Sequence, residues 1–384
     1  MKSIVLKHWK SVLAGAVLIL SGAVIFPVGY AVFITNGHPA ELFRFLGNYH
    51  RIKSEYFKSV DDAQLWKGAT KGMLEGLGDP YTTLLSGDTF DSFSRTTSGE
   101  YAGIGVLVGL DTDLNIRIFS VFPDSAAEEA GLKSGDLILS VDGLSASDLG
   151  LTGVSHTLRG QIGTTAALVV KREDQQLDIN VTRANITLPT VISRMAAPQI
   201  GYIHIFNFSN HTPDDFKKQL TLLKEKGCKK LIVDVRMNPG GVIDSVVDVA
   251  NQIISAGTVV SYHTKSGSSK VYTIDGAKER IPLVILIDKN SASAAEILAG
   301  AIQDRKEGIV MGETSYGKGT VQAVYQETEK TAVKISIAEY KTPSGKSIDK
   351  KGIKPDIEVK QEGRLFDFTS DTVLLKAIDY FNKT

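Results

Sequence analysis

The chain has 384 residues, 42% of them hydrophobic, and its 43 basic and 43 acidic residues give a formal net charge of zero. This balance gives no electrostatic basis for nucleic-acid binding and describes an ordinary globular protein with an appendage. The single cysteine, Cys228, excludes an intrachain disulfide and a zinc site made of several cysteines, and it is expected to be a small structural residue ahead of a buried strand. Neither an H-E-x-x-H motif nor a Walker-type loop occurs, so no metal and no cofactor is expected.

The N-terminal 34 residues have the pattern of a membrane anchor. Residues 1–10 form a basic tail with Lys2, Lys7 and Lys10, and residues 11–34 contain no charged side chain. About 20 apolar residues are enough to span a bilayer, and flanking lysines stay on the cytoplasmic side. The pattern predicts a single-pass cell-membrane protein whose remaining domains are extracytoplasmic. A cleaved signal peptide is the alternative, although its apolar core usually has only about 7–15 residues.

Two regions precede the largest domain. Residues 39–93 are expected to be helical because apolar side chains such as Leu42, Leu46, Tyr49 and Ile52 recur at helical spacing. Residues 99–185 have the pattern of a PDZ domain. In this pattern a short capped helix closed by glycine precedes a turn and a strand, a second helix follows over residues 151–158, and a further strand over residues 164–172.

The largest domain is expected over residues 190–360, followed by a C-terminal helical segment over residues 361–384. Short apolar runs such as Leu231-Ile-Val-Asp-Val235 and Pro282-Leu-Val-Ile-Leu-Ile-Asp288 alternate with helical patterns. Such alternation predicts an α/β core with a partly parallel sheet, in which functional groups lie on loops at the carboxyl ends of the strands.

Ser293 stands where a buried strand turns sharply into a helix, a geometry that exposes a serine hydroxyl. Ser293 and Glu296 also form the helix-capping pattern S-x-x-E, and the same tetrapeptide at Ser125–Glu128 carries no evident chemistry. Lys318 favours catalysis at Ser293, because a neutral lysine can take the proton of a serine nucleophile. Burial beside apolar groups can lower a lysine pKa to about 7–8, so the site has to be dry.

At these residues the sequence resembles the carboxyl-terminal processing, or tail-specific, proteases of the S41 serine peptidases. The resemblance rests on Ser291-Ala-Ser-Ala-Ala-Glu-Ile297, on Gly317-Lys-Gly-Thr-Val-Gln322 and on the 25-residue spacing from Ser293 to Lys318, and it covers nearly all of the chain after residue 38. It implies a core related to crotonases and Clp peptidases, with Ser293 as nucleophile, Lys318 as its base and Gln322 orienting the lysine. It further implies an oxyanion hole formed by the backbone amide of Gly240 or Gly241 with that of Ala294.

The same resemblance implies a serine endopeptidase whose substrates are proteins recognised by a free, apolar C-terminus at the PDZ domain. Gly103-Ile-Gly-Val106 is the candidate loop for the terminal carboxylate. Arg159, in an Arg-Gly-x-x-Gly-Thr setting, is a candidate for coupling peptide binding to assembly of the active site. Its alternative is a helix-end charge. The family also uses its N-terminal helices for packing or dimerisation, so a homodimer is a further expectation.

Two other function classes stay open at this point. A Ser-His-Asp hydrolase needs a histidine near Ser293, and His204, His211 and His263 are available. A binding-only protein with an inactive peptidase-like core is the other alternative, and intact Ser293, Lys318 and Gln322 argue against it.

Overall fold

The structure is a computed structural model that describes residues 28–111, 113–122, 124–187 and 189–383. The chain divides into two units, Met1–Pro80 and Tyr81–Thr384, and each is described by itself. Most of the predicted membrane segment, residues 11–34, lies outside the described residues. Within the described ranges, no helix is long and apolar enough to cross a membrane.

The first unit contains a pair of helices, α2 (Pro39–Glu55) and α3 (Asp62–Glu75). Tyr49 of α2 stacks on Trp66 of α3 with ring centroids 4.7 Å apart, and its hydroxyl donates a hydrogen bond of 2.7 Å to Asp62. These contacts fix α2 against α3. The helical pattern extends less far than expected, because Thr83–Ser86 form strand β1 of the second unit, ahead of helix α4 (Asp88–Ser98).

The core of the second unit is a mixed sheet in the order β10-β11-β12-β15-β16-β19, parallel except for β10 against β11. A partly parallel sheet was predicted, and this prediction is confirmed. The strands are β10 (Val191–Ala197), β11 (Ile200–Ile205), β12 (Lys230–Asp234), β15 (Leu283–Ile287), β16 (Ile309–Gly312) and β19 (Ile357–Glu358).

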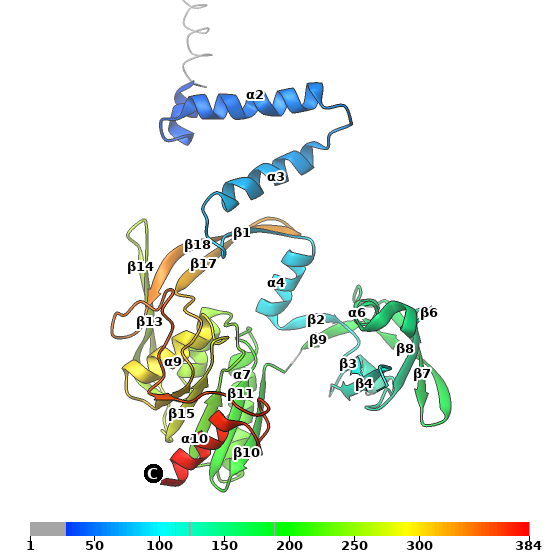
Figure 1. Cartoon of the computed structure of the whole chain (residues 1–384), viewed down its shortest axis with the longest axis vertical. Helices are drawn as coiled ribbons and strands as arrows, with labels where there is room; N and C mark the ends of the chain where they lie inside the picture. Colours follow the sequence, from blue (N-terminus) through cyan, green and yellow to red (C-terminus); the bar gives the residue numbers. More distant parts are fainter. Residues whose placement is uncertain (1–27, 112, 123, 188, 384) are drawn as a thin grey trace, which may run out of the picture. The chain divides into compact units, whose positions relative to one another are not determined.

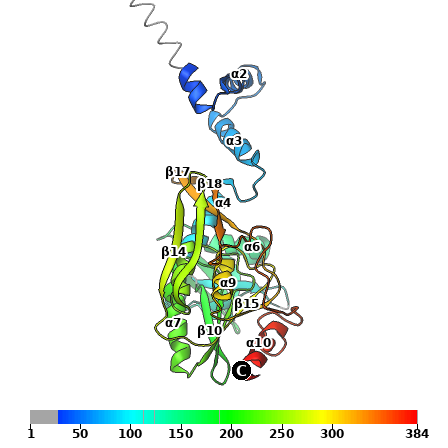
Figure 2. The same cartoon turned by 90° about the vertical axis from the view of Figure 1, so that its left-hand side faces the viewer.

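Helices cover both faces of this sheet. Successive residues of a strand point to opposite faces. Accordingly, Leu231 and Val233 pack with α7 (Thr212–Glu225), α8 (Ile243–Ala250) and α9 (Ala294–Asp304), whereas Ile232 packs with α10 (Thr372–Lys383). Figure 2 shows α7 and α10 on opposite sides of the strands. Burial on both faces explains the continuous apolar runs Leu231–Val233 of β12 and Leu283–Ile287 of β15.

A second, antiparallel sheet carries part of the candidate site. Its order is β1-β18-β13-β14, and β17 pairs with β18. Its remaining strands are β13 (Ser255–Thr264), β14 (Ser269–Gly276), β17 (Thr320–Thr328) and β18 (Thr331–Lys341). The β17–β18 register shifts between Val321 and Gln322. This irregularity follows directly after the Lys318 loop.

The PDZ-like domain is inserted between two short paired strands, β2 (Glu100–Gly103) and β9 (Ala184–Thr187) (Figure 1). Its sheet has the order β3-β4-β5-β7-β8 with β6 on β5, so β3 is an edge strand. Both expected helices form, and the second begins earlier than predicted and bends at Gly150, whose φ is 63°. The remaining elements are β3 (Val106–Leu110), β4 (Ile116–Val121), β5 (Leu137–Val141), β6 (Leu144–Ser145), β7 (Thr165–Arg172), β8 (Gln175–Thr182), α5 (Ala126–Glu129) and α6 (Ala146–Leu158).

Candidate active site

Ser293 lies in a strained turn between strand β15 and helix α9. Its φ of 54° and ψ of −114° are rare for a residue with a side chain. A conformation of this kind costs about 1–3 kcal/mol and persists only where the surrounding structure imposes it. A strand, a sharp turn and a helix were predicted here, and the structure has all three. Such a turn presents the hydroxyl outside the sheet, as nucleophile turns of hydrolases do.

Glu296 connects the serine turn to the lysine loop. Its side chain is fully buried, and its Oε2 accepts hydrogen bonds from the backbone amides of Ser293 at 2.8 Å and Lys318 at 2.9 Å. Its Oε1 accepts from the Ser315 hydroxyl at 2.6 Å and from the Gly317 amide at 2.7 Å. One carboxylate therefore fixes the backbone of both candidate catalytic residues. The helix-capping interpretation of Glu296 accounts for only one of these four bonds.

Tyr340 of β18 forms a second bridge between the same two residues. Its hydroxyl lies 2.6 Å from the Lys318 carbonyl oxygen and 3.2 Å from the Ser293 carbonyl oxygen. Burial, together with the nearby Glu296 carboxylate, raises the pKa of this hydroxyl well above its ordinary value. The hydroxyl therefore stays protonated and donates. Ser293 and Lys318, 25 residues apart in sequence, have two hydrogen-bond partners in common.

The loop Met237–Gly241 follows β12 and contacts the serine turn. The φ of Gly240 is 98°, and a Cβ at this residue would lie 2.7 Å from the Ser293 Cβ and 2.9 Å from the Ala294 nitrogen. Any side chain here would therefore clash with the turn. The Gly240 amide donates a hydrogen bond of 2.8 Å to the side-chain oxygen of Asn238, and the side-chain nitrogen of Asn238 donates to the Ile205 carbonyl oxygen.

The Gly240 amide is thus occupied by its own loop. Among the described residues, the backbone amides of Gly241 and Ala294 donate to no protein acceptor. An oxyanion needs donors that are free to face it. Of the two glycines considered, Gly241 therefore fits an oxyanion hole better than Gly240, with Ala294 at the start of α9 as the other donor.

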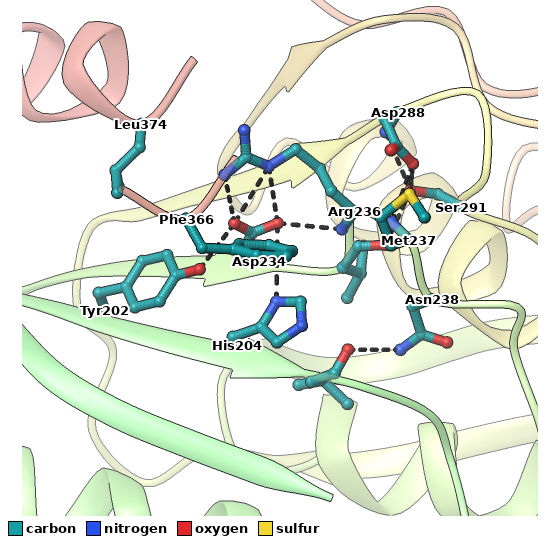
Figure 3. A network of polar contacts seen from close by, with 12 residues as sticks. Tyr202, His204, Asp234, Arg236, Met237, Asn238, Asp288, Ser291, Phe366 and Leu374 are labelled. Atoms are coloured by element: carbon teal, nitrogen blue, oxygen red, sulfur yellow. Dashed lines mark hydrogen bonds and ion pairs between the residues drawn. The ribbon is translucent and has the colours of Figure 1, made fainter. Parts of the chain in front are cut away.

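A buried ionic network lies next to the start of the loop Met237–Gly241 (Figure 3). Arg236 is only 1% exposed and contacts Asp234 at 2.6 Å and Asp371 of the C-terminal segment at 2.8 Å. The Tyr202 hydroxyl donates 2.8 Å to Asp234. Burial opposes the charge of Asp371, yet its bonds from Arg236 hold the pKa of this carboxyl below its ordinary value.

Further bonds connect this region to the serine turn. Asp288, at the end of β15, accepts the Met237 amide at 3.0 Å, and the Ser291 hydroxyl donates 2.8 Å to the Val235 carbonyl oxygen. The Ala292 amide donates 2.9 Å to the Asn238 carbonyl oxygen. The ends of β12 and β15 are therefore joined, which fixes the Gly241 loop relative to Ser293.

Gln322 is placed on β17, four residues after Lys318. Its amide nitrogen donates to the Thr320 hydroxyl at 2.8 Å, to the Thr320 carbonyl oxygen at 3.0 Å and to the Ser336 hydroxyl at 3.3 Å. The side-chain nitrogen is thus held by the β17–β18 hairpin. Its predicted role in orienting Lys318 stays a prediction.

The three histidines considered for a triad have their contacts elsewhere. Buried His204 lies 4.0 Å from Asp234 and packs on Phe366, and burial lowers its pKa. His211 faces Glu100 at 3.4 Å, and His263 bonds to Ser269 at 2.6 Å. These contacts do not favour a Ser-His-Asp arrangement at Ser293.

The predicted peptide-binding residues lie together in the PDZ-like domain. A groove of about 230 Å³ between β3 and the end of α6 is lined by all five of them: Gly103, Ile104, Gly105, Val106 and Arg159. Within the described part of the chain, the amides of Ile104 and Gly105 donate to no protein acceptor. The groove therefore offers free N–H groups beside an open strand edge.

Sequence reasoning missed Tyr340 as a bridge and the network of Asp234, Arg236 and Asp371. Asp234 is the last residue of the buried strand β12 and Arg236 follows two residues later, in the run Asp234-Val-Arg-Met-Asn-Pro-Gly-Gly241. A charge at the end of a buried strand, with an opposite charge next to it, is the signal that would have pointed to them. Cys228 is buried, and burial raises the pKa of its thiol, which fits the expected structural residue.

Comparisons with known proteins identify the family to which the chain is similar. The family profiles of Peptidase family S41, the PDZ domain and the activating protease CtpB N-terminal domain match residues 199–359, 102–182 and 34–89. The chain is 37% identical over 320 residues to the carboxy-terminal processing protease CtpB of Bacillus subtilis, a match that covers 82% of this chain and 66% of that protein. Identity to CtpA of the same organism is 36% over 317 residues, covering 81% and 67% of the two chains.

Among solved structures, the photosystem II D1 C-terminal processing protease superimposes with a TM-score of 0.51 at 27% identity, covering 84% of this chain and 89% of that one. The chain spans about two thirds of the length of the Bacillus relatives. Since several such relatives exceed 30% identity over most of this chain, and the peptidase and PDZ profiles match as well, the chain belongs to the carboxy-terminal processing proteases of serine peptidase family S41.

Proposed function

We propose that this protein is a membrane-anchored, extracytoplasmic endopeptidase that cleaves proteins recognised by their C-terminal tail, using Ser293 and Lys318. The observation that carries the catalytic part is the shared support of these two residues. Glu296 and Tyr340 each contact the backbone of both, and the nearby amides of Gly241 and Ala294 donate to no acceptor in the part of the chain that the structure describes.

In the proposed reaction, neutral Lys318 takes the proton of the Ser293 hydroxyl as its oxygen attacks the substrate carbonyl carbon. The oxyanion that forms is stabilised by the Gly241 and Ala294 amides. As the scissile C–N bond breaks, the lysine ammonium gives its proton to the leaving amine. Neutral Lys318 then takes a proton from water, whose oxygen attacks the acyl-enzyme, and returns that proton to the Ser293 oxygen as the ester bond breaks. Gln322 is assigned to orienting the lysine through its side-chain oxygen, since only the side-chain nitrogen is bonded to Thr320 and Ser336.

The PDZ groove is assigned to the substrate tail. An extended peptide adds to the open edge of β3, and its terminal carboxylate accepts from the Ile104 and Gly105 amides. Apolar residues including Leu158 and Ile186 line the groove and favour an apolar tail. Arg159, at the end of α6, is assigned to coupling tail binding to turnover. A homodimer through α2 and α3 remains a further expectation.

The test compares two versions of one unfolded protein substrate with an apolar tail, one with a free C-terminal carboxylate and one amidated. We expect the amidated version to bind at least about tenfold more weakly, because backbone amides recognise a carboxylate. Cleavage of both versions at equal rates would remove the PDZ domain from substrate recognition.

The coupling role of Arg159 is tested with Arg159→Ala. This variant should lower kcat more than it lowers the affinity for the substrate tail. Normal turnover of Arg159→Ala would leave this arginine as a helix-end charge.

The membrane topology is tested separately. The proposed topology is supported by lysines at positions 2, 7 and 10 before an uncharged segment, because flanking positive residues favour the cytoplasmic side under the positive-inside rule. External protease added to intact, wall-stripped cells should therefore degrade the protein or release a folded fragment. Full protection of the protein in intact cells, with digestion only after lysis, would contradict this topology.

A further inference from the structure

Tyr81, the first residue of the second unit, contacts the lysine of the proposed dyad. The Lys318 nitrogen lies over the Tyr81 ring, 4.8 Å from its centroid. A cation within about 6 Å of a ring centroid is attracted to the negative face of the ring. The sequence pattern Asp79-Pro-Tyr81 indicates only a turn, so this contact was not foreseen.

The Tyr81 ring is held in place by the strand that follows it. The Thr82 hydroxyl accepts a hydrogen bond of 3.0 Å from the Ser336 amide, and Thr82 is 6% exposed. From Thr83 onward, β1 pairs with β18. Since β18 also carries Tyr340, a single strand supports both the ring under the lysine nitrogen and the hydroxyl at the lysine carbonyl oxygen.

Tyr81 presents a neutral ring to the lysine. Burial and its hydrogen bond with Tyr316 raise the pKa of Tyr81 to about 12. Tyr81 therefore carries no charge over the pH range in which a protease of this kind works. Other groups near Lys318 include Tyr340, Tyr316 at the Tyr81 hydroxyl, and two carboxylates: Glu296 accepts from the Lys318 amide at 2.9 Å, and Asp349 accepts from the Gly319 amide at 3.2 Å.

We propose that Tyr81 is a positioning residue for the proposed Ser-Lys reaction, and that its ring face holds the Lys318 nitrogen and stabilises the ammonium formed when Lys318 takes the Ser293 proton. This inference rests on the proposed function of Lys318 as the base. The ring makes the charged form of the lysine more favourable, so it raises the pH at which the lysine becomes neutral. The same interaction lowers the energy of the charged state reached during the attack.

The experiment compares Tyr81→Leu and Tyr81→Met, which keep an apolar side chain but lack a ring, with Tyr81→Phe, which keeps the ring. In both ring-free variants we expect kcat at the high-pH plateau to fall about tenfold and the rising limb of the pH profile to move about half a unit lower. KM should change little. Tyr81→Phe should restore most of kcat and the position of the limb.

Tyr325→Leu is the matched control, because Tyr325 is an aromatic residue of the same sheet that is 54% exposed on β17. Folding of each variant is checked by its thermal transition. The proposal is overturned if Tyr81→Leu and Tyr81→Met keep the wild-type kcat, or if the rising limb of their pH profiles does not move to lower pH. It is also overturned if Tyr81→Phe loses as much kcat as these two variants. If Lys318→Ala still cleaves, the dyad itself fails. If Lys318→Ala is inactive and Tyr81→Leu is normal, only this inference fails.

Discussion

Ser293→Ala and Lys318→Ala are each expected to lower kcat by a factor on the order of 10⁴ or more while leaving the fold intact. The serine hydroxyl is the bond-forming atom, and its proton has no acceptor once the lysine nitrogen is absent. Lys318→Arg should be equally inactive, because a guanidinium does not lose its proton at any pH that the protein tolerates. Steady-state cleavage of an unfolded substrate with a free apolar tail measures these losses.

The turnover number kcat is expected to increase with pH. The reactive form of the base is the neutral lysine, so kcat should rise with pH through an apparent pKa of about 7–8 and then level off. A flat profile from about pH 5 to pH 9 would contradict a lysine base.

One combination of results would favour a Ser-His-Asp triad over the Ser293–Lys318 dyad. If Lys318→Ala remained active and replacement of His204, His211 or His263 abolished cleavage, the Ser-His-Asp alternative would hold. His204→Gln is the most informative of these variants, because His204 is buried beside Asp234. Its loss should reduce stability more than it changes the pH profile.

Short sequence patterns predicted the strands, turns and helix caps that depend on neighbouring residues alone. The continuous apolar run Leu283–Ile287 can be buried only in a sheet covered on both sides, and it is β15. The small and hydroxyl residues after it permit a sharp turn, and Ser293 stands in that turn with its positive φ. The Ser125 cap and the glycine after α5 were predicted by the same reasoning, and both are present.

Contacts between distant segments could not be predicted in this way. Arg236 and Asp371 are 135 residues apart in sequence, and no periodicity relates them. Tyr81 meets Lys318 only because β1 pairs with β18, a pairing that no local propensity encodes. The PDZ groove was predicted better, because its loop and β3 are consecutive in the chain.

Glu296 takes part both in a local helix-capping pattern and in contacts with the distant Lys318 loop, so its replacement is expected to have a large effect. Glu296→Gln keeps the size of the side chain but replaces one acceptor oxygen with an NH₂ group. Four donors surround the carboxylate, two at each oxygen: the amides of Ser293, Gly317 and Lys318 and the Ser315 hydroxyl. The NH₂ group cannot accept from the two donors at the oxygen that it replaces. Hydrogen bonds to a charged group contribute about 1.5–3 kcal/mol each, and Glu296 is fully buried. We therefore expect unfolding free energy to fall by about 3 kcal/mol or more, and kcat of the folded protein to fall at least about a hundredfold, because Ser293 and Lys318 lose their common support.

Glu128→Gln is the matched control, since Glu128 occupies the same position in the identical tetrapeptide Ser125–Glu128. Its carboxylate accepts only the Asp124 amide among the bonds seen there, at 2.8 Å, and this bond is exposed. Its replacement should cost no more than about 1 kcal/mol, as a helix-cap interaction does, and leave kcat unchanged. Urea unfolding and kcat of the two variants, measured side by side at a temperature where both are folded, separate the two roles. Equal effects of Glu296→Gln and Glu128→Gln would mean that Glu296 is only a helix cap. A much larger loss in Glu296→Gln on both measures is the result that a carboxylate joining nucleophile and base requires.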